Sequence, residues 1–298
     1  MVRTREGVGV SGSYSAEIRR ESPTCILFLL DQSGSMYDPF AGEAETRKAN
    51  AAADAINKLL RALIIRSTKN FKEPPRDYFD IGVIGYGSAR GVGPSLGGAL
   101  KGSVLVSTST LADNPLRVEK RMQKISDGAG GLVEAPRRFP VWFDPVAEAT
   151  TPMAEAMQYA NKTLKRWVAD HSKSYPPLVI NITDGQPNSD PTAEAKAITA
   201  LSVDDGNVLL YNLHLSSLRR EPILFPAGPS LLPDQYARML FEMSSVFPQK
   251  VREEFENAGY SLEPAARGFV FNSNPEVLIE FLDIGTRHVR PQESDQDS

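Results

Sequence analysis

The chain has 298 residues and a formal net charge of −4, with 41% hydrophobic and 23% charged residues. This composition is typical of a soluble globular protein with a sizeable core. The acidic balance argues against a nucleic-acid-binding surface, which would usually carry a basic excess. The single cysteine, Cys25, excludes an intramolecular disulfide and suits a reducing compartment.

The two ends of the chain differ in composition from its middle. Residues 1–22 are rich in Gly, Ser and Arg and lack the apolar stretch of a signal peptide, so we expect a loose N-terminal arm. Residues 291–298 are polar and acidic and are expected to be disordered. No run approaches the roughly 18 apolar residues of a membrane span. We therefore expect a single domain over 23–290, located in the cytoplasm and not in contact with a membrane.

The first half of this domain predicts two strands and one helix. Residues 25–30 and 78–86 are short apolar runs, as in strands of a covered parallel sheet. Between them, residues 43–67 repeat apolar side chains with a helical period, and Lys48 falls off that stripe. The stretch 88–148 shows little periodicity and reads as an insertion, with one short antiparallel strand expected near 104–108.

In the second half, helical and strand patterns alternate. This alternation predicts an α/β fold with a mostly parallel sheet. A second insertion is expected at 219–233. The predicted helices lie at 152–170, 193–203 and 236–243, around 251–255 and from Asn274 onward, and the strands at 178–182, 208–213 and 269–271.

Polar side chains follow two of the apolar strands. Asp31 ends the first strand and Asp184 follows the strand at 178–182. Because the carboxyl ends of parallel strands line one crevice, we expect the two carboxylates to meet there. Asp31, Ser33 and Ser35 alternate along the chain and can therefore converge on one point. Oxygen ligands of this kind select Mg²⁺, Mn²⁺ or Ca²⁺ over zinc.

Simpler interpretations of the same residues exist. Ser33 or Ser35 would then only cap a backbone turn, and Thr151 would be a plain N-cap with Pro152 at the first helical position. On spacing alone the N-cap interpretation of Thr151 is favoured. Other chemistry finds little support, since the three histidines show no ligand spacing and the sequence has neither a P-loop nor a G-x-S-x-G elbow.

Taken together, three short motifs resemble the metal-ion-dependent adhesion site of the von Willebrand factor A (VWA) family. They are Asp31-Gln-Ser-Gly-Ser35, Thr150-Thr-Pro152 and Thr183-Asp-Gly185, in the family's order. The resemblance covers about residues 24–285. It implies a Rossmann-like three-layer α/β VWA fold, with helices on both faces of the sheet and one short antiparallel edge strand.

The resemblance also implies a metal site made of Asp31, Ser33, Ser35, Thr151 and Asp184. The two serine hydroxyls would bind the metal directly. Thr151, Asp31 and Asp184 would bind it directly or through water. Thr150 is the alternative to Thr151. The implied ion is Mg²⁺, with Mn²⁺ or Ca²⁺ as substitutes, and one coordination position is left for a Glu or Asp of a protein partner.

Three functional hypotheses follow from these motifs. The first is an intracellular bacterial adaptor that binds a partner protein through the metal; short cytoplasmic relatives work beside ATPases, kinases or phosphatases, and the 88–148 insertion is expected to shape partner choice. The second is a Mg²⁺-dependent phosphohydrolase, although Ser33 stands where such enzymes carry a second aspartate. The third is a degenerate loop that binds no metal.

Overall fold

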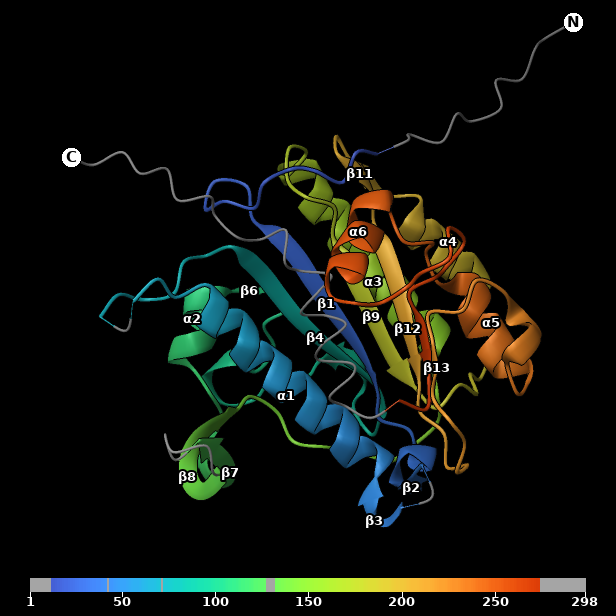
Figure 1. Cartoon of the computed structure of the whole chain (residues 1–298), viewed down its shortest axis with the longest axis horizontal. Helices are drawn as coiled ribbons and strands as arrows, with labels where there is room; N and C mark the ends of the chain where they lie inside the picture. Colours follow the sequence, from blue (N-terminus) through green and yellow to red (C-terminus); the bar gives the residue numbers. More distant parts are fainter. Residues whose placement is uncertain (1–11, 42, 71, 127–131, 274–298) are drawn as a thin grey trace, which may run out of the picture.

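A computed structural model describes residues 12–41, 43–70, 72–126 and 132–273. Its centre is an eight-stranded sheet with the order β13-β14-β12-β9-β1-β4-β5, in which β6 also pairs with β4 (Figure 1). The strands that build its middle run parallel: β1 (Thr24–Asp31), β4 (Phe79–Ser88), β9 (Leu178–Thr183), β12 (Leu209–His214) and β14 (Phe269–Phe271).

Short antiparallel strands flank this parallel core. β5 (Gly91–Pro94) and β6 (Val106–Ser107) pair with β4, and β13 (Ile223–Leu224) pairs with β14. β6 confirms the short antiparallel strand predicted near 104–108. The expectation of one antiparallel edge strand was too low, because both flanks of the sheet carry such strands.

Helices cover both faces of the sheet, so the molecule has three layers. Alternate residues of β1 point to opposite faces: Phe28 belongs to one buried apolar cluster and Leu29 to the other. One face is covered by α1 (Lys48–Arg66), α2 (Thr108–Asp113) and α6 (Gln249–Asn257); the other by α3 (Met153–Asp170), α4 (Thr192–Thr199) and α5 (Gln235–Met243). The predicted three-layer α/β fold is confirmed.

Two predicted helices are shorter than expected. The helix predicted over 43–67 begins only at Lys48, because residues Glu43–Arg47 form β3 and pair with β2 (Pro39–Phe40). The helix predicted over 193–203 ends at Thr199, because β10 (Ser202–Val203) turns back onto β11 (Gly206–Asn207). In both cases local strand pairing satisfies backbone groups that the helix would have used.

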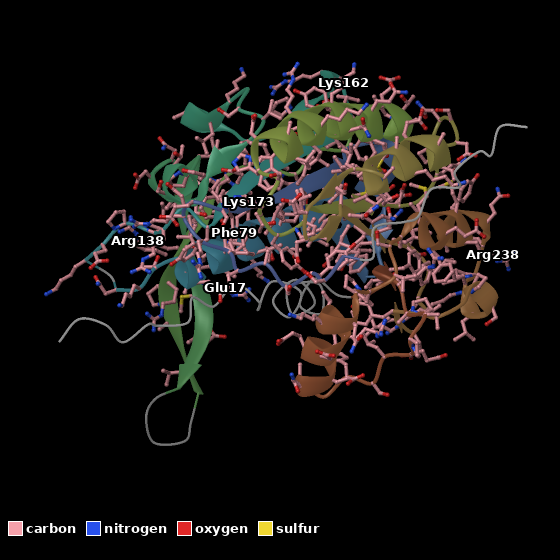
Figure 2. The ribbon with its side chains drawn as sticks, turned by 90° about the horizontal axis from the view of Figure 1, so that it is seen from above. Glu17, Phe79, Arg138, Lys162, Lys173 and Arg238 are labelled. Atoms are coloured by element: carbon pink, nitrogen blue, oxygen red, sulfur yellow. The ribbon has the colours of Figure 1, made fainter. Side chains whose placement is uncertain are left out.

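The 88–148 stretch, which showed little periodicity, is largely ordered. Beside β5, β6 and α2 it contains the long hairpin of β7 (Arg117–Ser126) and β8 (Leu132–Val141). Figure 2 shows this hairpin projecting from the body of the molecule. The short 3₁₀ turns are η1 (Gly34–Tyr37), η2 (Gly98–Leu100) and η3 (Pro229–Leu231). The helix predicted from Asn274 and the tail at 291–298 lie outside the described residues.

The described part of the predicted N-terminal arm contacts the domain. The Ser13 hydroxyl and the N–H groups of Ser15 and Ala16 all donate to the carboxylate of Asp205, next to β11. Residues 12–22 are therefore held against the sheet's amino-terminal edge without forming a helix or strand. Across the described residues, no helix has the length and apolarity that crossing a bilayer requires.

Candidate metal centre

Asp31 links the carboxyl ends of β1 and β9 at the predicted site. It is the last residue of β1 and is buried. Its Oδ1 accepts a hydrogen bond from the Ser33 N–H at 2.9 Å, and its Oδ2 accepts one from the Thr183 hydroxyl at 2.6 Å. Thr183 ends β9 and directly precedes Asp184. The two aspartate loops therefore lie side by side at one edge of the sheet.

The two serines of the first loop direct their hydroxyls toward each other. Ser33 Oγ and Ser35 Oγ are 3.1 Å apart, with Ser33 buried and Ser35 exposed. Ser33 precedes η1, but its side chain makes no capping hydrogen bond there. The interpretation of Ser33 as a backbone cap is therefore wrong, and its hydroxyl is available to a ligand.

The threonine loop packs directly against the serine loop. Ser33 and Ala149 form an isolated parallel bridge, and the Gly34 N–H donates to the Ala149 carbonyl at 2.8 Å. Gly87 of β4 lies between them with φ +92; a Cβ at this position would collide with the Thr150 carbonyl oxygen and lie 2.8 Å from the Ser33 nitrogen. Only glycine tolerates both that backbone conformation and that approach.

Thr151 is not an N-cap. Helix α3 begins at Met153 with Pro152 in the capping position, and no side chain caps it. The backbone of Thr151 is instead fixed by Asn188, whose Oδ1 accepts from the Thr151 N–H at 2.9 Å and whose N–H donates to the Thr151 carbonyl at 3.0 Å. Thr151 is buried and Thr150 exposed. The Thr151 hydroxyl is thus free of the capping role that spacing alone favoured.

Asp184 has one carboxylate oxygen in an ion pair and one without a hydrogen bond. Its Oδ2 lies 3.2 Å from Lys48 Nζ, and its side chain is only 7% exposed. Its Oδ1 is buried and has no hydrogen-bond partner among the described residues. A buried carboxylate oxygen without a donor costs free energy unless a cation or water reaches it. This oxygen is the atom of Asp184 that a cation or a water molecule could contact.

Lys48 was not recognised from the sequence as part of the site. It falls off the apolar stripe of α1, which predicts a solvated side chain, yet its side chain is 5% exposed. Nζ lies 3.3 Å from the Ser35 carbonyl oxygen and 3.7 Å from Asp38 Oδ2, besides its contact with Asp184. The structure therefore places a fixed ammonium ion beside the serine loop and the second aspartate.

Electrostatics at this edge disfavour two ionised carboxylates without a cation. Burial, with a smaller contribution from the charge of Asp184, raises the pKa of Asp31 to about 6, although hydrogen bonds from Thr183 and Ser33 oppose the rise. Burial also lowers the pKa of His214, whose Nε2 lies 2.8 Å from the Asp184 carbonyl oxygen. His214 is therefore packed in the interior.

Beneath the loops, a chain of buried side chains fixes the strand ends. The Tyr86 hydroxyl donates to Asn181 Oδ1 at 2.8 Å, and Asn181 Nδ2 donates to Asn212 Oδ1 at 2.9 Å. These residues belong to β4, β9 and β12, so the chain ties strands on both sides of β1. Satisfied networks of this kind give a site a single geometry.

The residue types at this edge fit a hard divalent cation. Two carboxylates, two serine hydroxyls and a nearby threonine provide the oxygen donors that Mg²⁺ prefers. Within the described ranges, no three His, Cys, Asp or Glu side chains gather as a metal cluster, so a nitrogen- and sulfur-rich zinc site is not formed there. The orphaned Asp184 Oδ1 gives such an ion a first anionic contact.

Comparisons with known proteins give only distant structural similarity. No family model matches the chain, and no curated protein matches its sequence. Among solved structures, manganese-loaded TRAP protein of Plasmodium vivax is similar with a TM-score of 0.43 and 15% identity, covering 88% of this chain and 72% of TRAP. The pilus adhesin RrgA of Streptococcus pneumoniae has a TM-score of 0.30 and 14% identity, with 58% and 21% covered. At such values nothing about a ligand or partner follows.

Proposed function

We propose that this chain is a metal-dependent protein-binding module of the VWA type. In this proposal Asp31, Ser33, Ser35, Thr151 and Asp184 hold Mg²⁺, with Mn²⁺ or Ca²⁺ as substitutes. A Glu or Asp of a partner protein completes the coordination. The observation that carries the proposal is the buried Oδ1 of Asp184, which has no hydrogen-bond partner among the described residues and belongs to a carboxylate that Lys48 links to the serine loop.

The chemistry of the donors favours capture of an acidic group. Mg²⁺ takes six oxygen ligands in near-octahedral geometry, and neutral hydroxyls leave more of its charge uncompensated than carboxylates would. The negative charge of Asp184 is already partly neutralised by the ion pair with Lys48, whose Nζ lies 3.2 Å from Asp184 Oδ2. An ion held here would therefore remain electropositive toward the solvent side, where Ser35 is exposed. A partner carboxylate supplies both a ligand and the missing negative charge.

The class of partner is proposed from the family resemblance. Cytoplasmic members of bacterial type act beside ATPases, kinases or phosphatases, and we propose a partner and a cellular location of that kind here. Nothing in the residues around the site selects one of these enzymes. The partner's required feature is an exposed Glu or Asp that can reach the serine loop.

Hydrolysis is the less favoured function of the same site. A phosphohydrolase of the kind considered above needs a second acid to protonate the leaving group. Ser33 stands at that position, and its hydroxyl pairs with Ser35. His214 is buried with Nε2 on the Asp184 carbonyl, so it is not positioned as a proton donor to a substrate. Binding without turnover is the function that these contacts support.

A pull-down from cell extract in Mg²⁺ or in EDTA tests the proposal. Wild-type protein should capture a partner in Mg²⁺ and release it in EDTA, and Asp31→Ala or Ser33→Ala with Ser35→Ala should capture none. A matched control is Ser107→Ala with Ser109→Ala, because these hydroxyls also lie 3.2 Å apart but beside α2. Capture at full affinity in EDTA would contradict the proposal.

A further inference from the structure

The β7–β8 hairpin concentrates positive charge on an acidic molecule. Its two strands contain six basic and two acidic residues, whereas the whole chain has a net charge of −4. The strands pair without interruption from Arg117↔Val141 to Ser126↔Leu132. The hairpin projects from the body of the molecule rather than covering the sheet (Figure 2).

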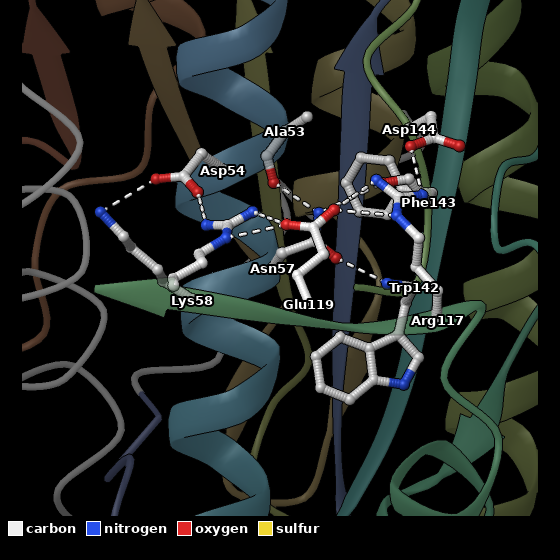
Figure 3. A network of polar contacts seen from close by, with 10 residues as sticks. Ala53, Asp54, Asn57, Lys58, Arg117, Glu119, Trp142, Phe143 and Asp144 are labelled. Atoms are coloured by element: carbon white, nitrogen blue, oxygen red, sulfur yellow. Dashed lines mark hydrogen bonds and ion pairs between the residues drawn. The ribbon is translucent and has the colours of Figure 1, made fainter. Parts of the chain in front are cut away.

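One face of the hairpin is anchored to α1 and to the loop after β8 by ion pairs. Arg121 pairs with Asp54 of α1 and with Glu119, and its guanidinium lies 3.7 Å above the Phe139 ring. Arg117 pairs with Glu119 at 2.7 Å and with Asp144 at 2.6 Å (Figure 3). These residues occupy alternate positions of β7, so they share one face. Arg117 and Arg121 on this anchored face are therefore paired within the molecule.

The opposite face has no such partners. Beside the Lys124↔Glu134 pair, it contains Val118, Lys120 and Met122 on β7 and their cross-strand neighbours Pro140, Arg138 and Pro136 on β8. We call these six residues the free hairpin face. Val118 is 42% and Met122 60% exposed, which is high for large apolar side chains. Their exposure on a projecting, paired element is typical of a contact surface.

The charges at the centre of this face repel each other. Lys120 lies directly opposite Arg138 in the antiparallel ladder, and both side chains are exposed. In the part of the chain that the structure describes, neither residue makes an ion pair or a hydrogen bond. Like charges directly opposite each other destabilise a hairpin. A carboxylate placed between them would relieve that repulsion.

We propose that the free hairpin face binds an extended acidic segment of a partner protein. Along each strand the pattern is apolar, cation, apolar at every second residue. The complementary segment carries a Glu or Asp flanked, two positions away on each side, by apolar side chains. Its carboxylate would bridge Lys120 and Arg138, and its apolar residues would cover Val118 and Met122.

Two cations between apolar neighbours suit a peptide better than nucleic acid. Binding to a phosphate backbone uses many basic groups along one surface, and this face has two. The proposed binding needs no metal, so it goes beyond the function proposed for the serine loop. It can therefore be tested independently of the metal site.

A peptide titration in EDTA tests the proposal on the full chain. The probe is a fluorescein-labelled peptide with the repeat Val-Ser-Glu-Ser-Val, in which valines stand two positions away on each side of the glutamate; binding is followed by anisotropy. Arg138→Glu should weaken binding by roughly tenfold or more. Arg137→Glu is the matched control, because it makes the same charge change one residue away on the anchored face. Melting curves of both variants check the fold, and Lys120→Glu gives a second variant of the free face.

Several results would overturn the proposal. Equal weakening by Arg137→Glu and Arg138→Glu would show only general charge attraction. Equal binding of the same peptide with serine in place of both valines would remove the role of Val118 and Met122. Tighter, Arg138-dependent binding to phosphatidylserine vesicles or duplex DNA would replace the partner class. Roughly tenfold tighter peptide binding after deletion of residues 291–298 would identify the chain's own acidic tail as the occupant. Concentration-dependent dimerisation lost in Arg138→Glu would identify a second copy.

Discussion

Replacing Lys48 by methionine probes the proposed metal site most directly. The side chain keeps its length and apolar stem but loses the ammonium that lies 3.2 Å from Asp184 Oδ2. Both partners of this pair are almost fully buried, at 5% and 7% side-chain exposure. Removing one partner of such a pair leaves an uncompensated buried charge and costs about 3–5 kcal/mol of stability. We expect a loss of this size in EDTA.

The same change should strengthen metal binding. Metal–oxygen distances are about 2.1 Å, so an ion on the Asp184 carboxylate would lie within roughly 7 Å of Lys48 Nζ. Repulsion between one and two unit charges at that separation is about 1.2 kcal/mol in bulk water and about 5 kcal/mol at an effective dielectric constant of 20. The water value alone corresponds to about sevenfold in Kd. We therefore expect Lys48→Met to bind Mg²⁺ at least that much more tightly.

Calorimetric titration and thermal melting with and without Mg²⁺ measure both effects. Mg²⁺ should raise the Tm of Lys48→Met more than that of wild type, because the ion replaces the missing charge. Lys58→Met is the matched control: Lys58 lies on the same helix and pairs with Asp54 at 2.9 Å, but is 37% exposed. Its loss should cost under about 1 kcal/mol and leave metal affinity unchanged. Weaker Mg²⁺ binding by Lys48→Met than by wild type would refute this reasoning.

Three further predictions concern the same edge of the sheet. Thr183→Val removes the hydroxyl that donates to Asp31 Oδ2 and should lower the free energy of unfolding by about 1–3 kcal/mol, measured by chemical denaturation. Thr163→Val, a control within α3, should lower it by about 0.5 kcal/mol or less. Gly87→Ala should prevent or strongly impair folding, measured by soluble yield and melting, while Gly91→Ala, with φ +77 but open space, should cost only about 1–2 kcal/mol. Finally, burial raises the pKa of Asp31 to about 6, so the folded state holds this proton more tightly than the unfolded chain. In EDTA, the Asp31 contribution should make stability fall by about 2 kcal/mol as pH rises from 4 to 7, and Asp31→Asn should lose that dependence in urea melts. A Thr183→Val protein as stable as wild type, a Gly87→Ala protein as stable as Gly91→Ala, or an unchanged pH profile in Asp31→Asn would contradict the respective prediction.

The parts of the fold that were predictable are those that depend on continuous apolar burial. The strands ending at Asp31 and Thr183 are buried at every position, so their runs stand out in the sequence. Because parallel strands end at a common edge, the approach of the two aspartate loops followed from those runs. The role of Thr151 was harder to predict, because Thr-Pro before a helix is equally typical of an N-cap. Only the start of α3 at Met153 separates the N-cap interpretation from the metal-ligand interpretation.

The remaining features depend on pairing between distant residues. The burial of Lys48 results from Asp184, which lies far away in sequence and leaves no mark on the periodicity of α1. The β7–β8 hairpin could not be predicted from the sequence for a different reason. Arg117, Glu119 and Arg121 face the molecule while Val118 and Met122 face outward, which inverts the usual pattern of a half-buried strand. Polar anchoring of this kind cannot be recognised by counting apolar residues.

Helix α1 has a mechanical consequence for the two surfaces it touches. Lys48 at its first turn contacts Asp184, and Asp54, less than two turns later, holds Arg121 of the hairpin. A helix segment this short, about 9 Å long, moves as a rod. If a ligand bound to the β7–β8 hairpin shifts this part of α1 along the helix axis, the Lys48 ammonium moves relative to Asp184. Such a ligand would then change the affinity of the metal site for its ion. Thermodynamic linkage requires the ion to change the affinity of the hairpin for its ligand by the same factor.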